Sequence, residues 1–557
     1  MQPRVLHLHT HFLFPFSIDK QAVQEDCPEL WPAGSSWLDG VDRWIAAHTS
    51  KSAPFAAQLG GWSRTPYTQF DLNSRAYQDM VFFHPIVRRV FFDSSGVAGI
   101  GSEKESLLRH YAIPVEGRHL FYEAEDVKGR AAAVPVTGLH LFLFANGIGI
   151  LSIGVEQRGL PVGEVLWINE SLRKIYPSSG RQIREGRVPG HMGLSVRPGN
   201  DRQVLVEERF GSCDMIGFLP PLSKTITSLL YFADYDRQEF EPVLDERMIV
   251  YSYLELDPNS VAAGYLESED YQVLLSRFLY VDRWGADYRY HPGFTKRQMA
   301  RHLYRRWAHQ GTYYGFTGYS SVTVTFGTRD CDEHQLSEGF LIHRMFDSRY
   351  YLMAVIALFY RATLLDFAER SALISRLVYL DQQDRRLTSE SIERVSDLRG
   401  EFLHFSNYWH FSELANKDEE SEHFEIQCRQ YRIPSMKRDI EDEIDKLNQS
   451  LHNYFQFRNT EAINRLAMLS LIFGAGAVVT GFFGMNFGGG FAELFFEPPP
   501  NREAAHFGAM VIVVVLTLAA LCFGLFVVAA YWQDYRDILT LRRAGMGRER
   551  VSLKRSP

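Results

Sequence analysis

The tripeptide Gly484-Met485-Asn486 directly follows an apolar run, Leu466–Phe483, in which eighteen residues carry no charge. At 1.5 Å per residue such a run spans about 27 Å as a helix, close to the hydrocarbon thickness of a bilayer. An asparagine amide at the water-facing end of this helix can hydrogen-bond the water shell of an ion. The motif therefore indicates a place where a hydrated cation could stop at a membrane surface.

A second apolar run, Phe507–Trp532, contains twenty-six residues without charge and ends in Tyr531-Trp532. Aromatic residues of this kind are enriched at membrane–water interfaces. Two spans are too few for one chain to enclose a pore, so several copies would be needed. Neither span contains an acidic or basic side chain, which favours an ion that keeps some of its water over a bare ion bound deep in the membrane.

Charges on either side of the second run predict the orientation of the chain. The segment 486–506 holds three acidic residues and one basic residue, whereas the segment 533–557 holds seven basic and three acidic residues. Because Lys and Arg are retained on the cytoplasmic side, we expect both termini to be cytoplasmic and the short loop to lie outside. The expected location is the plasma (inner) membrane.

The first span continues a long predicted helix that begins after Pro434 and reaches Phe483. Apolar residues along its first part recur at spacings of four and three, which is typical of a coiled-coil seam and predicts an oligomeric stalk. These residues are Ile440, Ile444, Leu447, Leu451 and Tyr454. Small residues then share one face and could pack against another helix or line a pore. They are Ala467, Ser470, Gly474, Ala477, Gly481 and Gly484.

Together these features resemble the CorA family of divalent-cation transporters, whose members carry this GMN motif at the outer end of the first of two C-terminal spans. The resemblance implies a homopentamer, with Gly484, Met485 and Asn486 as the selectivity filter. It implies a pore lined further inward by Thr460, Ile463, Leu466, Gly474, Ala477 and Gly481. Glu493 corresponds to an acidic residue in the outer loop that would attract cations.

The expected fold is an α+β membrane protein, a CorA-like oligomeric funnel with a large cytosolic α/β domain, a long stalk helix and two C-terminal transmembrane helices. Its expected parts are a cytosolic α/β domain at 1–345, a helical region at 346–433, the stalk at 434–465, the pore-lining span at 466–483, the outer loop at 484–506, the second span at 507–532 and a basic cytoplasmic tail at 533–557.

Several local patterns predict individual elements. Asn146-Gly147 between two apolar runs predicts a β-hairpin, and the alternation of Val322, Val324 and Phe326 predicts a strand. Residues 297–309 are expected to form an amphipathic helix, and Gly400 is expected to break the helical region. The apolar stretch 350–360 is too short to cross a bilayer, so it predicts a buried helix instead.

The function best supported by these patterns is Mg²⁺ uptake, with Co²⁺ or Ni²⁺ as further candidate ions. Mg²⁺ releases its waters reluctantly, and an inside-negative membrane potential gives a divalent ion about 4.6 kcal/mol per 100 mV. No P-loop is present, so we expect neither ATP use nor a cofactor. Two alternatives remain: a proton-coupled Zn²⁺ transporter of the same superfamily, and a sensor or metal-dependent enzyme that the two spans only tether.

Two further clusters could bind metal ions. His7, His9 and His11 alternate, which places them on one face of a predicted strand. The H-x-H pattern resembles that of metal-dependent amidohydrolases, so these histidines could be metal ligands. They could instead be ordinary residues of a surface or partly buried strand. Asp439, Asp442 and Glu443 belong to an acidic cluster on the stalk. This cluster is either a solvated face or a regulatory divalent-cation site between subunits.

Composition excludes some classes of partner. The chain of 557 residues has 59 basic and 67 acidic residues, for a net charge of −8. That balance gives no reason to expect nucleic-acid binding, which usually leaves a basic patch. The five cysteines are far apart in the sequence, so neither a disulfide framework nor a zinc ribbon is predicted. The expected partners are membrane lipid, divalent cations and further copies of the chain.

Overall fold

The computed structural model describes most of the chain up to Asn486 and a few residues beyond it. The described residues are 3–486, apart from 33, 50–57, 66–80, 93–105, 177–179, 187, 198–200, 210–220, 245–246, 263, 284–289, 327–341 and 384–386, together with eight residues between 511 and 526. The chain divides into two compact units, Met1–Asp445 and Lys446–Pro557. The expected domain boundaries remain predictions.

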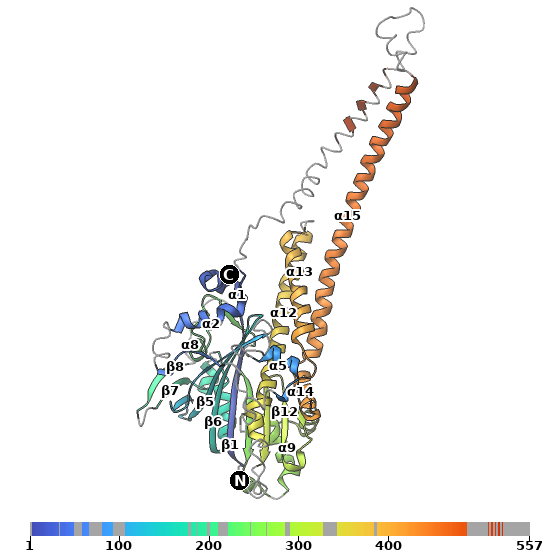
Figure 1. The fold of residues 1–557 in the computed structure, drawn as a ribbon. Coiled ribbons are helices and arrows are strands. Elements are labelled where there is room, and N and C mark those ends of the chain that lie inside the picture. Colours follow the sequence, from blue (N-terminus) through green and yellow to red (C-terminus); the bar gives the residue numbers. More distant parts are fainter. Residues whose placement is uncertain are drawn as a thin grey trace, which may run out of the picture. The chain divides into compact units, whose positions relative to one another are not determined.

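A mixed, largely antiparallel β-sheet forms the centre of the first unit (Figure 1). Its main path follows the order β11 (Leu303–Tyr304), β12 (Tyr313–Phe316), β13 (Ser320–Phe326), β10 (Ile249–Leu256), β1 (Arg4–Ile18), β6 (Ile148–Pro161), β5 (Ala131–Phe144), β4 (Leu120–Glu125), β7 (His191–Val196) and β8 (Gln203–Arg209). Beside this path, β2 (Ser63–Arg64) pairs with β3 (Leu108–Ile113), β3 with β5, and β9 (Phe240–Pro242) with β1.

The β5–β6 hairpin turns at Asn146-Gly147, where Gly147 has φ 96°. Strand β13 forms over the predicted alternation, so the predictions of this hairpin and of this strand are both confirmed.

Strand β1 lies in the middle of the sheet and pairs along one edge with β6 over almost its whole length. Along its other edge it pairs with β10 as far as Leu13 and with β9 from Phe16 onward. Pro15 therefore falls between the two partners, where a missing N–H breaks no ladder hydrogen bond. This arrangement explains how a strand of 15 residues tolerates a proline.

The two faces of β1 differ in chemistry. Leu8, Phe12, Phe14 and Phe16 belong to the main hydrophobic core and are fully buried. On the same face, the Thr10 hydroxyl donates to Asn169 Oδ1 of α6 (Val162–Leu172) over 3.1 Å. The opposite face carries the three histidines, which the sequence analysis expected on one face of a surface or partly buried strand. They do share one face, and they are buried rather than at the surface.

Helices cover both faces of the sheet and connect its strands. Besides α6, they include α1 (Lys20–Asp26), α2 (Trp37–His48), α5 (Pro85–Phe91), α7 (Gly180–Arg184), α8 (Lys224–Leu229), α9 (Glu269–Tyr280) and α10 (Pro292–His302). A second group comprises α11 (Ile342–Met345), the π-helix η8 (Phe346–Tyr350), α12 (Tyr351–Gln383), α13 (Ser389–His404), which a π-helical turn (Phe405–Trp409) follows, and α14 (Asp418–Gln430). Helix α12 packs against β1 and β6 on the histidine face.

Two predicted helix boundaries are wrong. The helix expected over 297–309 ends at His302, because the chain then pairs as β11 with β12. Gly400 lies inside α13 and does not break it. An added Cβ at Gly400 would meet nothing within 4 Å, so this glycine sits on an open helix surface. Neighbouring side chains such as Leu398 and Phe402 are buried and hold the helix together.

The helix Ile342–Gln383 is long and apolar enough to cross a membrane by length and composition alone, and it is the one such helix among the described residues. In the most apolar part of this helix, however, 72% of the residues are buried inside the protein. A helix that is apolar on all sides and covered by its own chain is a core helix. The expectation that residues 350–360 form a buried helix is confirmed.

Replacing Phe12 by Ala should test whether β1 is central to the first unit. Phe12 is fully buried and packs edge-on against Tyr122, with 6.2 Å between ring centroids. Loss of a buried aromatic ring costs about 3–5 kcal/mol, so Phe12→Ala should lower the thermal unfolding midpoint of the purified full chain by several degrees. Phe12→Leu, which keeps most of the volume, should lower it much less. Equal unfolding midpoints for wild type and Phe12→Ala would contradict the central position of β1 in the core.

His423 should make the protein less stable as the pH falls. It is buried among Tyr314, Phe316 and Tyr350, and burial lowers its pKa to about 3. Between pH 6.5 and 3, His423 binds a proton in the unfolded chain but not in the folded chain. The stability that neutral His423 contributes is therefore complete above pH 6.5 and decreases below it. The free energy of unfolding falls by at most about 1.4 kcal/mol per pH unit. We expect His423→Phe to lose less thermal stability than wild type between pH 7.5 and 5.5. If the stability of His423→Phe had the same pH dependence as that of wild type, His423 would be excluded as a cause of the loss of stability at low pH.

Candidate functional site

All predicted pore and filter residues that the structure describes lie on one unbroken helix, α15 (Ile433–Asn486) (Figure 1). The helix begins directly after Arg432, whose φ of 60° ends the preceding segment, and Pro434 occupies its first turn, where its missing N–H costs no hydrogen bond. Within α15, no glycine occurs before Gly474. Helix α15 ends at Asn486, the last residue of the motif, so the prediction of a long helix from Pro434 through Phe483 is confirmed.

Large apolar side chains on the second half of α15 are exposed. Leu466 is 59% exposed, Leu471 74% and Phe473 63%. At 100° per residue, Leu466 and Phe473 point to the same side of the helix, about 20° apart, whereas Leu471 points about 140° away from Leu466. A helix that is apolar on all sides and uncovered by its own chain requires lipid or other protein around it. The exposure is consistent with the predicted span 466–483.

Among the described residues, no neighbouring element packs against the small residues of the predicted pore face. An added Cβ at Gly474 or Gly481 would meet nothing within 4 Å. At 100° per residue, Ile463, Leu466, Gly474, Ala477 and Gly481 occupy an arc of about 80°, and Thr460 lies about 40° beyond its edge. These six side chains are exposed. Their small size therefore suits contact with other copies of the helix or with a central pore.

Several predicted residues lie outside the part of the chain whose side chains the structure describes. The side chains of Gly484, Met485 and Asn486 belong to this group, as do Glu493 and the tail 533–557. In the predicted second span 507–532, the eight described residues have helical backbone and are exposed. They are Val511, Val514, Val515, Leu518, Ala519, Cys522, Phe523 and Phe526.

The acidic cluster at the start of α15 is solvent-exposed. Asp439, Asp442 and Glu443 are all exposed, whereas Ile440 and Ile444, which begin the predicted coiled-coil seam, are buried by the chain itself. These two seam positions therefore need no second subunit. The Ser371 hydroxyl of α12 donates to Glu443 Oε2 over 3.2 Å. The three carboxylates remain free to meet cations from solvent.

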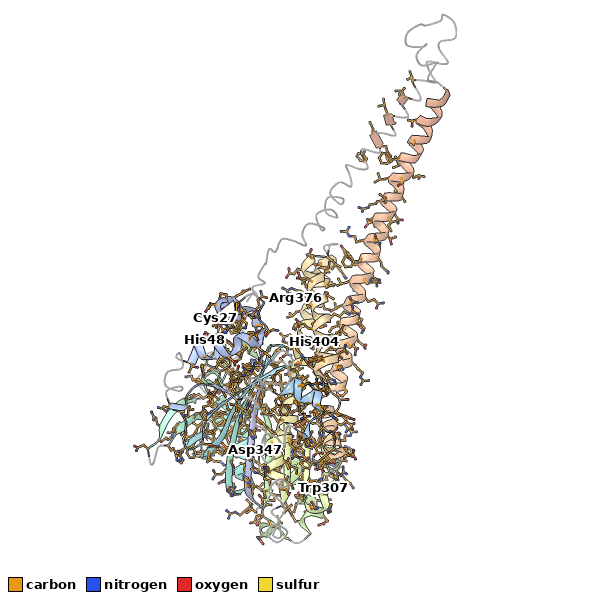
Figure 2. The ribbon with its side chains drawn as sticks, in the orientation of Figure 1. Cys27, His48, Trp307, Asp347, Arg376 and His404 are labelled. Atoms are coloured by element: carbon orange, nitrogen blue, oxygen red, sulfur yellow. The ribbon has the colours of Figure 1, made fainter. Side chains whose placement is uncertain are left out.

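The three histidines of β1 meet residues that are distant in the sequence. His343 of α11 and Asp347 of η8 lie against the same face of the strand. Among the described residues, His9, His11 and Asp347 form the one group of three ligand-type side chains whose atoms lie within 4.8 Å of one another. Figure 2 labels Asp347 beside the sheet. Sequence analysis missed His343 and Asp347, because no local pattern links them to β1.

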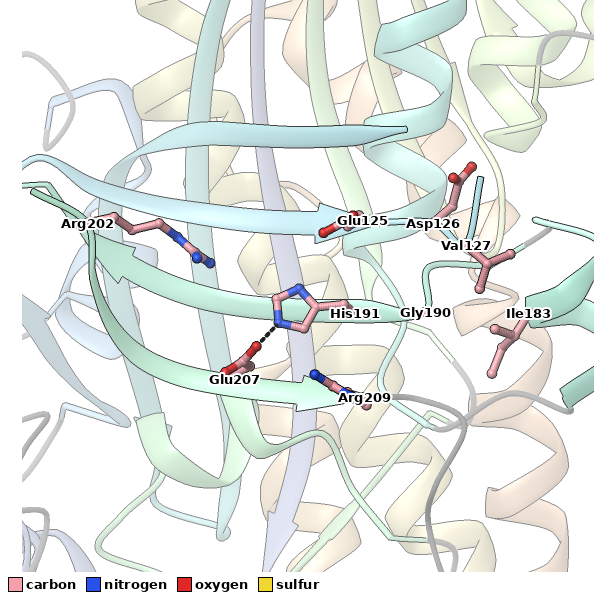
Figure 3. A pocket seen from close by; sticks show the side chains of 9 residues that line it. All are labelled: Glu125, Asp126, Val127, Ile183, Gly190, His191, Arg202, Glu207 and Arg209. Atoms are coloured by element: carbon pink, nitrogen blue, oxygen red, sulfur yellow. Dashed lines mark ion pairs between the residues drawn. The ribbon is translucent and has the colours of Figure 1, made fainter. Parts of the chain in front are cut away.

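A separate surface cavity of about 550 Å³ lies at the β4, β7 and β8 end of the sheet (Figure 3). His191 and Glu207 form an ion pair across its wall, with 2.8 Å between Nε2 and Oε1. Both acidic and basic side chains line the cavity, and Glu207 is half-exposed. None of the residues singled out in the sequence lines this cavity.

Comparison with known proteins found a family match in the C-terminal part of the chain. Residues 366–528 match the family model described as CorA-like Mg²⁺ transporter protein. Among solved structures, the CorA magnesium transporter from Methanocaldococcus jannaschii is similar at 12% identity, covering 55% of this chain and 94% of that chain with a TM-score of 0.21. Such a low score does not support a shared arrangement of the two chains. No curated protein matches the sequence.

The matched segment contains α13, α14, α15 and the Gly484-Met485-Asn486 motif. This family consists of transporters and not enzymes. Residues 366–528 are therefore a domain of the CorA-like Mg²⁺ transporter family, as the resemblance of the motif and its helix predicts.

Proposed function

We propose that the protein is a homopentameric channel for divalent cations that takes up Mg²⁺ through the plasma membrane, driven by the membrane potential. The observation that carries this proposal is the course of α15, which runs without a break to Asn486. The helix carries an exposed stripe of small residues along the segment that the family model matches. Two spans per chain, at 466–483 and 507–532, with both termini in the cytoplasm, complete the proposal.

The chemistry of the proposed filter suits a hydrated ion. In the pentamer, Asn486 from each subunit would form a ring whose amide oxygens accept hydrogen bonds from the waters of Mg²⁺. Gly484 and Met485 would shape the turn, and Glu493 would raise the local cation concentration. Because the span 466–483 carries no charge, it offers no carboxylate to replace the inner water shell of Mg²⁺, which that ion releases reluctantly.

The pore would continue inward along the exposed arc of α15. Gly481, Ala477 and Gly474 leave room for a hydrated ion, whereas Leu466 and Ile463 would narrow the path with apolar side chains. Apolar constrictions can close a pore by excluding water. Thr460, at the edge of the arc, would line the cytoplasmic entrance.

Replacing Asn486 by Ala should reduce Mg²⁺ flux into proteoliposomes by at least about tenfold, which corresponds to about 1.4 kcal/mol of lost stabilisation. Asn453→Ala is the matched control, because Asn453 is an exposed asparagine of the same helix outside the predicted span. It should leave the flux unchanged. A protein that is only tethered by its spans would show no Mg²⁺ flux with or without Asn486.

The same assay separates the alternative transported ion. Flux of Mg²⁺, Co²⁺, Ni²⁺ and Zn²⁺ is measured with and without a pH gradient, at each of two membrane potentials. A potential-driven Mg²⁺ channel should respond to the potential and not to the gradient. Zn²⁺ flux that requires the pH gradient would instead support the proton-coupled Zn²⁺ transporter.

The exposed carboxylates at the start of α15 would act as a sensor of internal Mg²⁺. Bound divalent ions would neutralise Asp439, Asp442 and Glu443 between subunits and hold the pore closed. The triple change Asp439→Asn, Asp442→Asn and Glu443→Gln should therefore make currents less sensitive to inhibition by internal Mg²⁺.

Glu393→Gln together with Asp397→Asn is the control for this experiment, since both residues are exposed on α13. This double variant should be inhibited like wild type. Equal inhibition of the stalk variant and wild type would show that the cluster is only a solvated helix face.

A further inference from the structure

The face of β1 that meets α11 and η8 concentrates imidazole rings in the interior of the first unit. His7, His9 and His11 are 7%, 4% and 2% exposed. Their rings form a chain of contacts with His343, with 4.3 Å between the centroids of His7 and His343 and 4.7 Å between those of His9 and His11. Buried histidines usually serve packing alone, so a ligand site requires evidence about individual nitrogen atoms.

The Nε2 atoms of two of these histidines converge on one carboxylate. Asp347 Oδ1 lies 3.3 Å from His11 Nε2 and 3.9 Å from His9 Nε2. In a tetrahedral site with metal–ligand distances of about 2.0–2.1 Å, ligand atoms lie about 3.4 Å apart. The distance from Asp347 Oδ1 to His11 Nε2 already fits this value. The distance to His9 Nε2 would have to shorten by about half an ångström.

The other ring nitrogen of each histidine is held by a separate polar group. His9 Nδ1 lies 2.9 Å from His343 Nε2, and His11 Nδ1 lies 3.4 Å from Ser152 Oγ. Metal-binding histidines commonly donate their second ring N–H to such a partner, which orients the ring and leaves the opposite nitrogen as the ligand. In this cluster that arrangement directs both Nε2 atoms toward Asp347. The Thr137 hydroxyl also lies within 3.4 Å of His9 Nε2.

We propose that His9, His11 and Asp347 bind a first-row transition-metal ion of the Zn²⁺ type inside the cytosolic unit, with His343 and Ser152 orienting the two imidazoles. Two imidazoles and one carboxylate suit Zn²⁺, Co²⁺ or Ni²⁺, whereas Mg²⁺ prefers oxygen ligands alone. A water molecule would complete the coordination. This site is distinct from the filter and the stalk carboxylates and does not depend on transport.

A neighbouring carboxylate, Glu156, engages the first histidine of the strand. Glu156 accepts a hydrogen bond from His7 at 2.8 Å, and this interaction is the main cause that lowers the pKa of Glu156 to about 2. His7 is thus engaged by its own carboxylate, next to the proposed ligands.

The bound ion would link two elements that the sequence separates widely. His9 and His11 lie on the central strand, whereas Asp347 lies on η8, which leads directly into α12. π-Helical turns inside longer helices occur frequently at functional sites. A metal ion coordinated from both sides would hold η8 against β1, so binding should stabilise the folded protein as well as retain the ion.

The test measures metal retention by the purified full chain in detergent. After chelation and gel filtration, the protein is incubated with Zn²⁺, Co²⁺ or Mg²⁺, dialysed and analysed for bound metal, and its thermal unfolding midpoint is recorded. We expect one tightly bound Zn²⁺ per chain, a raised midpoint with Zn²⁺, visible absorption bands from bound Co²⁺, and no such effects with Mg²⁺. A wild-type chain that retains no Zn²⁺ would overturn the proposal.

Variants assign the site to its residues. His11→Gln and Asp347→Asn should each weaken Zn²⁺ binding by about a hundredfold or more, and His343→Gln by about tenfold. His191→Gln is the matched control, because it removes another histidine–carboxylate pair (Figure 3) and should retain Zn²⁺. Asp347 is 30% exposed, so Asp347→Asn should fold even if His11→Gln does not. Unchanged binding in Asp347→Asn would overturn the assignment.

One further variant separates this proposal from the proposed channel. Asn486→Ala should keep the tightly bound Zn²⁺, since the filter lies on another part of the chain. Loss of Zn²⁺ in Asn486→Ala would place the bound ion at the filter and overturn the proposal, whereas failure of transport with retained Zn²⁺ would leave it standing.

Discussion

Burial of both faces of β1 is the constraint on which the first unit depends. A central strand usually buries apolar side chains on each side, and β1 does so with Phe12, Phe14 and Phe16 on its core face. Its other face instead carries imidazoles, whose polar nitrogens must find partners once water is excluded. The chain meets this requirement by placing α11 and η8 over the strand, so that His343 and Asp347 face the histidines. The same packing brings α12 against the sheet.

Helix α12 and helix α15 show how similar apolar composition leads to different surroundings. Residues of α12 such as Leu358 and Phe359 are fully buried by strands and helices of the same unit. On α15, Leu471 and Phe473 are exposed although they are equally apolar. Since exposure of such side chains to water is unfavourable, α12 completes the core of the first unit, whereas the exposed surface of α15 suits contact with lipid or with other protein. By length and hydropathy alone, α12 qualifies as a membrane span. Its burial by the rest of the first unit shows instead that it is a core helix.

Local patterns predicted the parts of the structure that local chemistry determines. The Asn146-Gly147 turn, the strand at Val322–Phe326 and the helix after Pro434 all follow from signals within a few residues, and the structure confirms them. The predicted effect of Gly400 is wrong, because buried neighbours on the same helix outweigh one weak residue. The end of α10 at His302 depends on pairing of β11 with β12, which lies outside the helical pattern. His343 and Asp347 lie more than 330 residues from His9 and His11, and only the fold brings them together.

The proposed filter and the proposed histidine site differ in the chemistry of their ligands, and therefore in how tightly they would hold an ion. An amide ring that contacts only the water shell of an ion binds it weakly enough to release it, as conduction requires. Imidazole nitrogens and a carboxylate in direct contact with an ion bind it tightly, and they favour Zn²⁺ over the far more weakly nitrogen-binding Mg²⁺. A chain with both kinds of site could transport one divalent ion through its hydration shell while a different ion stays bound in its cytosolic unit. The cytosolic site would therefore bind transition metals in preference to Mg²⁺, whatever ion the filter admits.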